Sequence, residues 1–175
     1  MRVRVALVSD THGLSDPRLP GLFGGCARVL HAGDIVTTPV LRALAGVAEV
    51  TAVRGNNDHG PELARLPEHV LVALDGLRAL MVHDLGARER PHAPVRRLLA
   101  RERPEIVIHG HSHRPGAAVH EGRLFVNPGS AGPRRFSLPR TAAILDVEGR
   151  TARVTFYDLS GDGAAPYGEV VEAAL

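Results

Sequence analysis

Residues 106–115 read IVIHGHSHRP, an apolar run that changes into histidines at every second position. The run predicts a β-strand over Ile106–His109, and the glycine that follows marks its end. The same order, an apolar run followed at once by side chains able to bind metal, occurs at four more places: VALVSDTH (5–12), RVLHAGD (28–34), TAVRGNND (51–58) and LMVH (80–83). Because ligands in open α/β sheets gather outside the carboxyl ends of the strands, these side chains are expected to meet in space.

Further apolar runs extend this pattern over the chain. Together they predict nine strands: Val3–Val8, Val29–His31, Val47–Val53, His69–Leu74, Arg78–His83, Ile106–His109, Arg123–Val126, Thr141–Val147 and Ala152–Tyr157. Helical spacing appears in Pro39–Leu44 and Ala93–Arg103. The dipeptides Asp75-Gly76, Glu121-Gly122 and Glu148-Gly149 predict hairpins. Strands and helices alternate in the first half and the second half is mostly antiparallel, so we predict an α/β fold of two mixed β-sheets packed face to face and flanked by helices.

The length and composition favour one intracellular domain. A chain of 175 residues buries a substantial core, so we predict a single domain over 1–175, with its core in about 1–158 and a tail at 159–175 without an assigned element. The single cysteine, Cys26, excludes a disulfide framework and suits the cytoplasm. A net charge of +2 gives no reason to expect nucleic acid, and the apolar run before Asp10 is too short to span a membrane.

The side chains at the strand ends form a set of metal-binding groups. One histidine at a strand end is usually structural, but the joint pattern is hard to explain in that way. The set contains two carboxylates, one amide and four imidazoles: Asp10, His12, Asp34, Asn56, His83, His111 and His113. These donors suit manganese, iron or zinc. Since seven donors exceed the needs of one ion, we expect two divalent ions about 4 Å apart, bridged by a carboxylate such as Asp34.

The charge of such a site points to its substrate. Two divalent ions, two aspartates and a bridging hydroxide leave a net charge of about +1, which favours an anion. Phosphate esters are the natural class, because paired metals generate a nucleophile near neutral pH and stabilise charge on the phosphoryl oxygens.

The motifs, taken in order, resemble a known family. Asp10-x-His12, Gly33-Asp34, Gly55-Asn56-x-Asp58, His83 and Gly110-His111-Ser112-His113 resemble the motifs of the calcineurin-like metallophosphoesterase superfamily, and the resemblance spans Val3 to Val147. The segment Asn127-Pro128-Gly129-Ser130, followed by Pro133-Arg134, is similar to the YfcE-type small phosphodiesterases. The resemblance implies a four-layer αββα sandwich with two divalent ions, manganese above all, with nickel, zinc or iron as alternatives. It also implies that one ion is held by Asp10, His12, Asp34 and His113, and the other by Asp34, Asn56, His83 and His111.

Several neighbouring residues are candidates for catalytic or supporting roles. We predict that Asp58 and His111 take part in catalysis, although Asp58 matches a family position that usually orients the site. The candidates for supporting roles are His31, Asn57, His59, His109 and Arg134. His31 could equally be a core histidine, and the turn before Arg134 favours a structural role. His69, His92 and His120 lie outside the motifs and are predicted to be surface residues.

One position departs from the family pattern. Asn57 stands where relatives carry a histidine or cysteine that can protonate the leaving group. Asparagine has no useful proton to give, so strong general-acid assistance is not expected there unless His59 substitutes.

These observations predict a phosphodiesterase that hydrolyses small phosphodiesters by attack of a metal-bridging hydroxide. A phosphomonoesterase or nucleotidase with the same site and a non-catalytic interaction scaffold of the same fold are the alternatives. A nuclease is disfavoured, because a basic, aromatic-lined groove is not evident. The expected partner is a small phosphoester, with no nucleic acid and no membrane, and self-association stays open.

Overall fold

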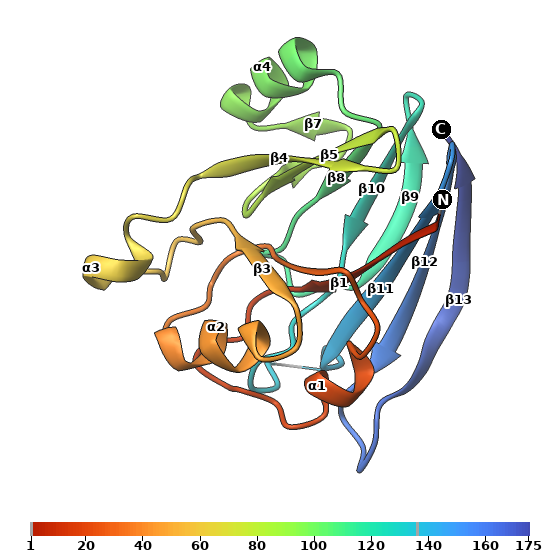
Figure 1. Cartoon of the computed structure of the whole chain (residues 1–175). Coiled ribbons are helices and arrows are strands. Elements are labelled where there is room, and N and C mark those ends of the chain that lie inside the picture. Colours follow the sequence, from red (N-terminus) through yellow and green to blue (C-terminus); the bar gives the residue numbers. More distant parts are fainter. Residues whose placement is uncertain (1, 136) are drawn as a thin grey trace.

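The computed structural model describes residues 2–135 and 137–175, and its strands form two large mixed sheets (Figure 1). Within this described part the first sheet has six strands in the order β13-β12-β11-β1-β2-β3. Their bounds are β1 (Arg2–Val8), β2 (Arg28–His31), β3 (Glu49–Ala52), β11 (Thr141–Glu148), β12 (Thr151–Asp158) and β13 (Ala165–Ala174). Strands β1, β2 and β3 run parallel, and β11, β12 and β13 continue the sheet in antiparallel pairs.

The second sheet, in the same described part, has five strands in the order β4-β5-β8-β10-β9. Their bounds are β4 (His69–Leu74), β5 (Leu77–Val82), β8 (Ile106–Ile108), β9 (Gly116–His120) and β10 (Arg123–Asn127). A small hairpin pairs β6 (Gly86–Ala87) with β7 (Arg90–Pro91). The helices are α1 (Leu19–Leu22), α2 (Thr38–Ala45), α3 (Gly60–Leu63) and α4 (Ala93–Glu102), and each carries a proline in its first turn, where the missing N–H costs nothing.

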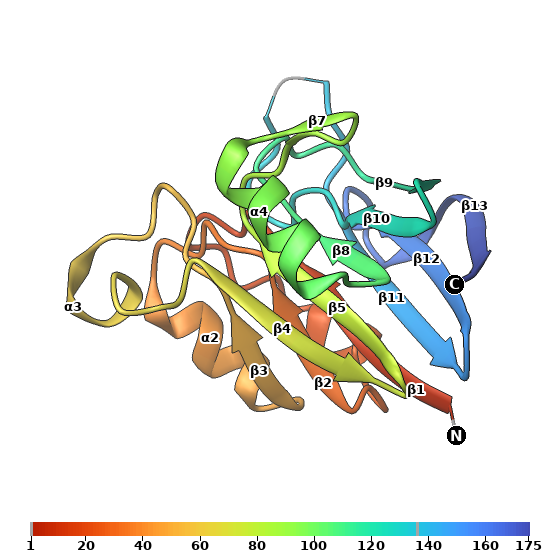
Figure 2. The same cartoon turned by 90° about the horizontal axis from the view of Figure 1, so that it is seen from above.

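Three apolar layers hold the elements together. Alternate residues of β1 point to opposite faces, so Val5 and Leu7 pack between the two sheets whereas Ala6 and Val8 pack under α1 and α2. On the far side of the second sheet, Val107 packs against the apolar face of α4. Figures 1 and 2 show the resulting order of helix, sheet, sheet and helices. The predicted αββα sandwich is confirmed.

The predicted elements are largely confirmed. Each of the nine predicted strands and both predicted helices has a counterpart, and the three predicted hairpins join β4 to β5, β9 to β10 and β11 to β12. β9 and β13 were not predicted, because they contain glycine, alanine and exposed residues in place of an apolar run. Backbone pairing with β10 and β12 makes them strands, so β13 occupies most of the tail left unassigned over 159–175.

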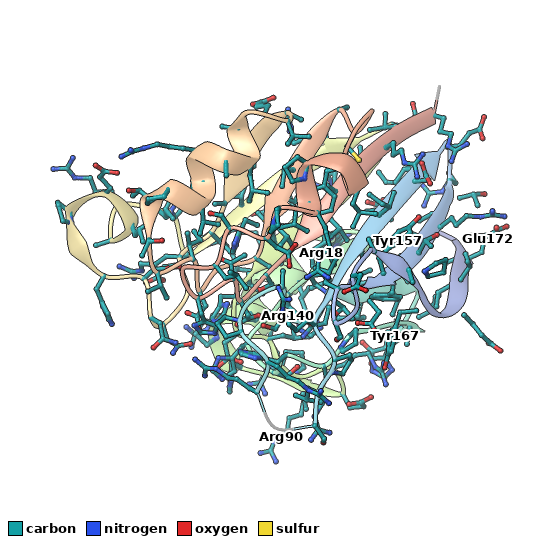
Figure 3. The ribbon with its side chains drawn as sticks, turned by 90° about the horizontal axis from the view of Figure 1, so that it is seen from below. Arg18, Arg90, Arg140, Tyr157, Tyr167 and Glu172 are labelled. Atoms are coloured by element: carbon teal, nitrogen blue, oxygen red, sulfur yellow. The ribbon has the colours of Figure 1, made fainter. Side chains whose placement is uncertain are left out.

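An ion network ties Asp16, which lies between β1 and α1, to the second half of the chain. Arg140 donates hydrogen bonds to Asp16, to the carbonyl oxygens of Ala131 and Gly132, and to Leu159. Arg18 donates to both oxygens of the same carboxylate, and Figure 3 shows Arg18 near Arg140. Burial would raise the pKa of Asp16, but the hydrogen bonds from Arg18 and Arg140 outweigh it and lower the pKa to about 2.

Candidate metal centre

The first group of candidate ligands comes from the ends of β1 and β8. His113 Nε2 lies 3.2 Å from Asp10 Oδ1 and 3.3 Å from His12 Nε2. His12 Nε2 lies 4.0 Å from the same aspartate oxygen. These residues, which are far apart in the sequence, therefore present two imidazole nitrogens and one carboxylate oxygen to a common point.

The second group comes from the ends of β3, β5 and β8. Asn56 Oδ1 lies 3.1 Å from His83 Nε2 and 3.0 Å from His111 Nδ1. The other ring nitrogen of His83, Nδ1, lies 2.7 Å from the carbonyl oxygen of Ala32, which fixes the orientation of the ring. An amide oxygen and two imidazole nitrogens thus converge, as the sequence predicts.

Asp34 lies between the two groups. Its Oδ2 is 3.8 Å from His12 Nε2 and its Oδ1 is 3.5 Å from His83 Nε2. Each carboxylate oxygen therefore faces an imidazole of a different group, which is the arrangement that a bridging carboxylate needs. Asp10 also contributes to both sides, because its ligand atoms lie within 4.8 Å of those of Asp34 and His83 as well as those of His12 and His113.

The residues fit a cation. Asp10 is fully buried, and its Oδ1 accepts no hydrogen bond from the described residues. Such an atom is costly to bury without a partner, and a cation would supply one. The two Nε2 atoms of His12 and His113 face each other at 3.3 Å, an arrangement that a shared cation or proton stabilises. Imidazole nitrogens with carboxylate and amide oxygens suit manganese, iron or zinc.

Electrostatics keep the central carboxylate ionised. Burial acts to raise the pKa of Asp34, but hydrogen bonds from His83 and from the backbone and side chain of Asn57 outweigh it and hold the pKa well below its usual range. The pKa of His12 is also lowered, but here burial itself is the main cause and the charge of Arg135 is the second. A charged Asp34 and a neutral His12 are the protonation states that metal ligands require.

Burial also acts to lower the pKa of His83, but the neighbouring carboxylates determine the net shift. Desolvation lowers the pKa of this ring, while Asp34 and Asp10 raise it by more, so the net shift is upward. Both ring nitrogens face acceptors, Ala32 on one side and Asn56 and Asp34 on the other. The carboxylates of Asp34 and Asp10 therefore attract positive charge beside His83, at the position where a second cation would lie.

The backbone at the centre is strained. Five candidate ligands occupy the left-handed region, which residues other than glycine rarely adopt: Asp10, His12, Asp34, His111 and His113, with φ from 46° to 68°. Conformations of this kind cluster at functional sites, where the surrounding structure maintains them.

Two glycines allow the ligand loops to approach one another. A Cβ atom on Gly110 would lie 2.0 Å from Ser9 Oγ and 2.7 Å from Asp10 Oδ2. A Cβ atom on Gly55 would lie 2.2 Å from both the backbone nitrogen and Oδ1 of Asp34. The glycines before His111 and Asn56 are therefore needed for close packing against the carboxylates.

Asp58 is placed as a support. Its Oδ1 accepts hydrogen bonds from the backbone N–H groups of Ile35 and Val36, and its Oδ2 accepts them from Asp34 and Gly55. Its side chain thus joins the loops that follow β2 and β3. With four donors on its carboxylate, this geometry disfavours the predicted catalytic role of Asp58 and favours the orienting role.

Two of the other supporting candidates, the buried His31 and the half-buried His109, lie next to the ligand loops. His31 contacts Thr11 Oγ1 through Nε2 at 3.0 Å and accepts the backbone N–H of Gly33 at Nδ1. His109 contacts the side-chain amide of Asn127. Burial lowers the pKa of each ring to about 4, so both are neutral imidazoles that hold loops in place.

The structure adds residues that the motifs did not indicate. Arg135, the residue after the predicted Arg134, lies 3.5 Å from His12 Nδ1. Asp84 follows His83 and lies 3.3 Å from His92 and 3.8 Å from His111. His92 is exposed, as predicted for a surface residue, but it is close to the centre in space. The carboxylate next to a ligand histidine was a signal available in the sequence.

A cavity of about 470 Å³ opens beside the second group. It is lined by Arg54, Asn56 and His59 from the segment after β3, and by His83, Asp84 and His111 from the segments after β5 and β8. His59 is therefore placed at this cavity, whereas Asn57 uses its side-chain N–H on Asp34 Oδ2 at 2.6 Å. This cavity is open space directly next to the second group of candidate ligands.

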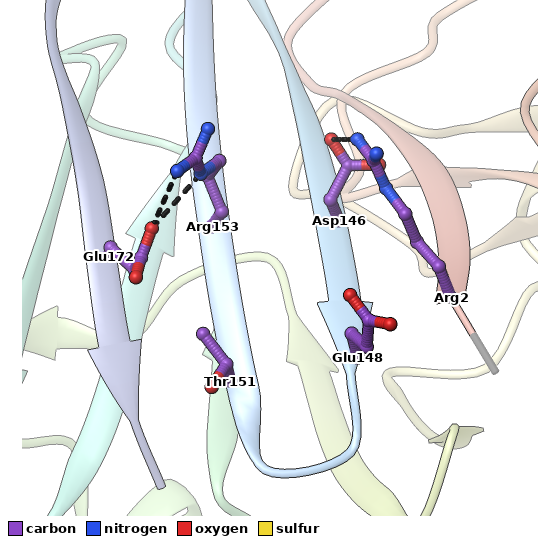
Figure 4. A pocket seen from close by; sticks show the side chains of 6 residues that line it. All are labelled: Arg2, Asp146, Glu148, Thr151, Arg153 and Glu172. Atoms are coloured by element: carbon purple, nitrogen blue, oxygen red, sulfur yellow. Dashed lines mark hydrogen bonds and ion pairs between the residues drawn. The ribbon is translucent and has the colours of Figure 1, made fainter.

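A separate hollow of about 510 Å³ lies at the Arg2 end of β1, opposite to the end that Asp10 follows (Figure 4). Its walls are formed by ion pairs between Arg2 and Asp146 and between Arg153 and Glu172. Since these charges neutralise each other and none belongs to the candidate ligands, this hollow is not the site.

A family model described as the calcineurin-like phosphoesterase superfamily domain matches residues 3–150. The chain belongs to this superfamily. The predicted family is thereby confirmed, and membership indicates a phosphoester hydrolase that uses divalent metal. In the described residues, no helix has the length and apolar character needed to cross a membrane.

Several named proteins are similar to the chain over most of its length. A protein named "Probable metallophosphoesterase YsnB" from Bacillus subtilis is 28% identical over 164 residues, which is 91% of this chain and 94% of that protein. The solved structure of the phosphoesterase YfcE from E. coli has a TM-score of 0.71 at 21% identity and covers 98% of this chain and 99% of its own. Vps29 from Entamoeba histolytica, solved in complex with zinc, has a TM-score of 0.79 at 21% identity and covers 97% of this chain and 99% of its own.

Proposed function

We propose that the protein is a phosphodiesterase that depends on two divalent ions and hydrolyses small phosphodiesters. The main support is the position of Asp34, because its two carboxylate oxygens face imidazoles of two different ligand groups. The buried Asp10 Oδ1, which accepts no hydrogen bond from the described residues, supports the same proposal, since a cation would compensate its burial. Manganese is the ion that we propose first, with nickel, zinc or iron as alternatives.

When bound, two divalent ions would supply a nucleophile near neutral pH and would neutralise charge on the phosphoryl group. The chain's own residues orient this chemistry. Asp34 stays ionised because His83 and Asn57 donate to it. His111, whose side chain is 46% exposed, borders the cavity and contacts the substrate in our proposal.

The leaving group receives little proton assistance from the chain. Asn57 donates its side-chain N–H to Asp34, so it positions the carboxylate and offers no acidic proton. His59 lines the cavity and is exposed, which makes it the side chain in this loop able to act as a proton donor. We propose that substrates have leaving groups that depart readily unless His59 fills this role.

The decisive experiment loads the purified protein with manganese, nickel, zinc or iron and measures hydrolysis of bis-p-nitrophenyl phosphate and p-nitrophenyl phosphate. Faster hydrolysis of the diester supports the phosphodiesterase. Faster hydrolysis of the monoester assigns the same site to a phosphomonoesterase or nucleotidase. Rates measured on cyclic and linear nucleotides then indicate the class of the natural substrate.

A protein-interaction scaffold is the second candidate function. The likeness to Vps29 favours it only at the level of the fold. A chain that binds no ions and hydrolyses none of these esters supports the scaffold. Against it, the candidate ligands of both groups converge in the structure. We further propose a cytoplasmic protein that acts on small molecules, since the lone Cys26 is buried and forms no disulfide.

A further inference from the structure

His111 differs from the other candidate imidazole ligands in its exposure. Its side chain is 46% exposed, compared with 5% for His83, 8% for His12 and 10% for His113. Packing holds the three buried rings, whereas an exposed ring needs another means of fixing its orientation. A second contact can fix a ligand ring in this way, as His83 shows: the carbonyl oxygen of Ala32 binds its ring nitrogen Nδ1, opposite the ligand atom Nε2.

The group opposite the ligand atom of His111 is the carboxylate of Asp84. His111 Nδ1 faces Asn56 Oδ1 at 3.0 Å, and its Nε2 lies 3.8 Å from Asp84 Oδ2. A carboxylate on that side favours the tautomer with the proton on Nε2, which leaves the lone pair of Nδ1 free for an ion. We propose that Asp84 is a positioning residue that fixes the ring and tautomer of His111 at the second ligand group.

Asp84 is itself held by a built loop. The backbone N–H of Gly86 donates to its Oδ1 at 2.9 Å, and the loop closes where His92 N–H donates to the carbonyl oxygen of Leu85. The ring of His92 packs on Gly86, where a Cβ atom would lie 3.1 Å from Nε2. His92 Nε2 also lies 3.3 Å from Asp84 Oδ2, so two imidazoles share one carboxylate oxygen.

This shared oxygen provides a matched pair of variants. Asp84→Ala removes the contacts to both His92 and His111, whereas His92→Ala removes one contact and leaves the carboxylate to His111. This proposal rests on the proposed function in one respect only, because both require that the protein binds divalent ions. We therefore expect Asp84→Ala to weaken the affinity for the second manganese ion about tenfold or more, and His92→Ala, which keeps the carboxylate and the backbone N–H that closes the loop, to weaken it much less.

Calorimetric titration with manganese measures both affinities in the full chain, and ¹⁵N NMR of the zinc-loaded protein reads the tautomer of His111. Asp84→Asn keeps an acceptor oxygen without the charge and should retain part of the affinity, so it serves where Asp84→Ala fails to fold. Wild-type affinity and an unchanged tautomer in Asp84→Ala overturn the inference, as does an equal loss in His92→Ala. No binding to the wild-type chain refutes the proposed function instead.

Discussion

Asp34 faces both ligand groups, so the negative charge of its side chain, more than its size, decides how well it serves as a shared metal ligand. Asp34→Asn keeps the size of the side chain but weakens it as a shared ligand. We expect kcat on the best diester to fall by at least about a hundredfold, which is the scale at which one electrostatic element is felt in other enzymes. Steady-state kinetics at confirmed metal content measure this, with Asp146→Asn at the far end of the first sheet as a matched control. Near-normal turnover would remove Asp34 from its role.

Asn57 and His59 set the expected response to the leaving group. Because Asn57 has no acidic proton, the rate should depend steeply on leaving-group pKa across a series of aryl diesters. His59→Ala should leave that slope unaltered if the ions act alone, and His69→Ala at the exposed start of β4 is the control. A flat dependence in the wild type that becomes steep in His59→Ala identifies His59 as the donor.

The residue types of the site were predictable, and their exact partners were not. The seven candidate ligands follow apolar runs, and that order is visible in the sequence. The contact of Arg135 with His12, where Arg134 was predicted to matter, depends on how the chain turns after Ala131 and Gly132. The approach of His92 to Asp84 depends on a loop closed by backbone hydrogen bonds, which residue types alone do not specify.

At the scale of elements, the loop after β8 depends on the absence of a side chain at Gly110. A methyl group there would lie 2.0 Å from Ser9 Oγ and would displace the Asp10 carboxylate that Ser9 binds. We expect Gly110→Ala to lower the free energy of unfolding by about 1–3 kcal/mol and to weaken ion binding. Gly116→Ala is the matched control, because nothing lies within 4 Å of its added Cβ.

Denaturant unfolding and manganese titration of the two glycine variants measure these effects. Equal stability and equal affinity of the two variants would show that the loop accepts a side chain. A loss in affinity without a loss in stability would place the effect on the ligand geometry alone.

Elements with an apolar face were predictable, and elements made by pairing were not. The runs of β1 and β8 are buried in the sandwich and therefore read as hydrophobic. β13 is mostly exposed and pairs along an edge, so its residues carry little pattern. Tertiary pairing decides such strands, and single-sequence periodicity does not record it.

At the scale of the whole molecule, Asp16 and Arg140 connect the first and last thirds of the chain. The pKa of Asp16 is about 2 in the folded protein and 3.8 in its ordinary state, so the unfolded chain binds more protons between these values. Stability from this carboxylate is therefore present above about pH 4 and is lost as the pH falls toward 2.

Asp16→Asn tests this connection. We expect the variant to be less stable than the wild type by about 1–2 kcal/mol at pH 5 and the difference to shrink toward pH 2. Urea unfolding at several pH values measures it, with Glu169→Gln on exposed β13 as the control. A difference that stays constant with pH would assign the effect to packing.

The ligands come from the ends of β1, β2, β3, β5 and β8, so the centre exists only when both sheets are assembled. Ions that bind the native state and not the unfolded chain raise the free energy of unfolding by RT ln(1 + [L]/Kd), or about 2.7 kcal/mol at a hundredfold excess over Kd. The melting temperature should accordingly rise with manganese concentration in the wild type and much less in Asp34→Asn. Metal supply would then govern how long the chain survives proteolysis, as well as whether it turns over substrate.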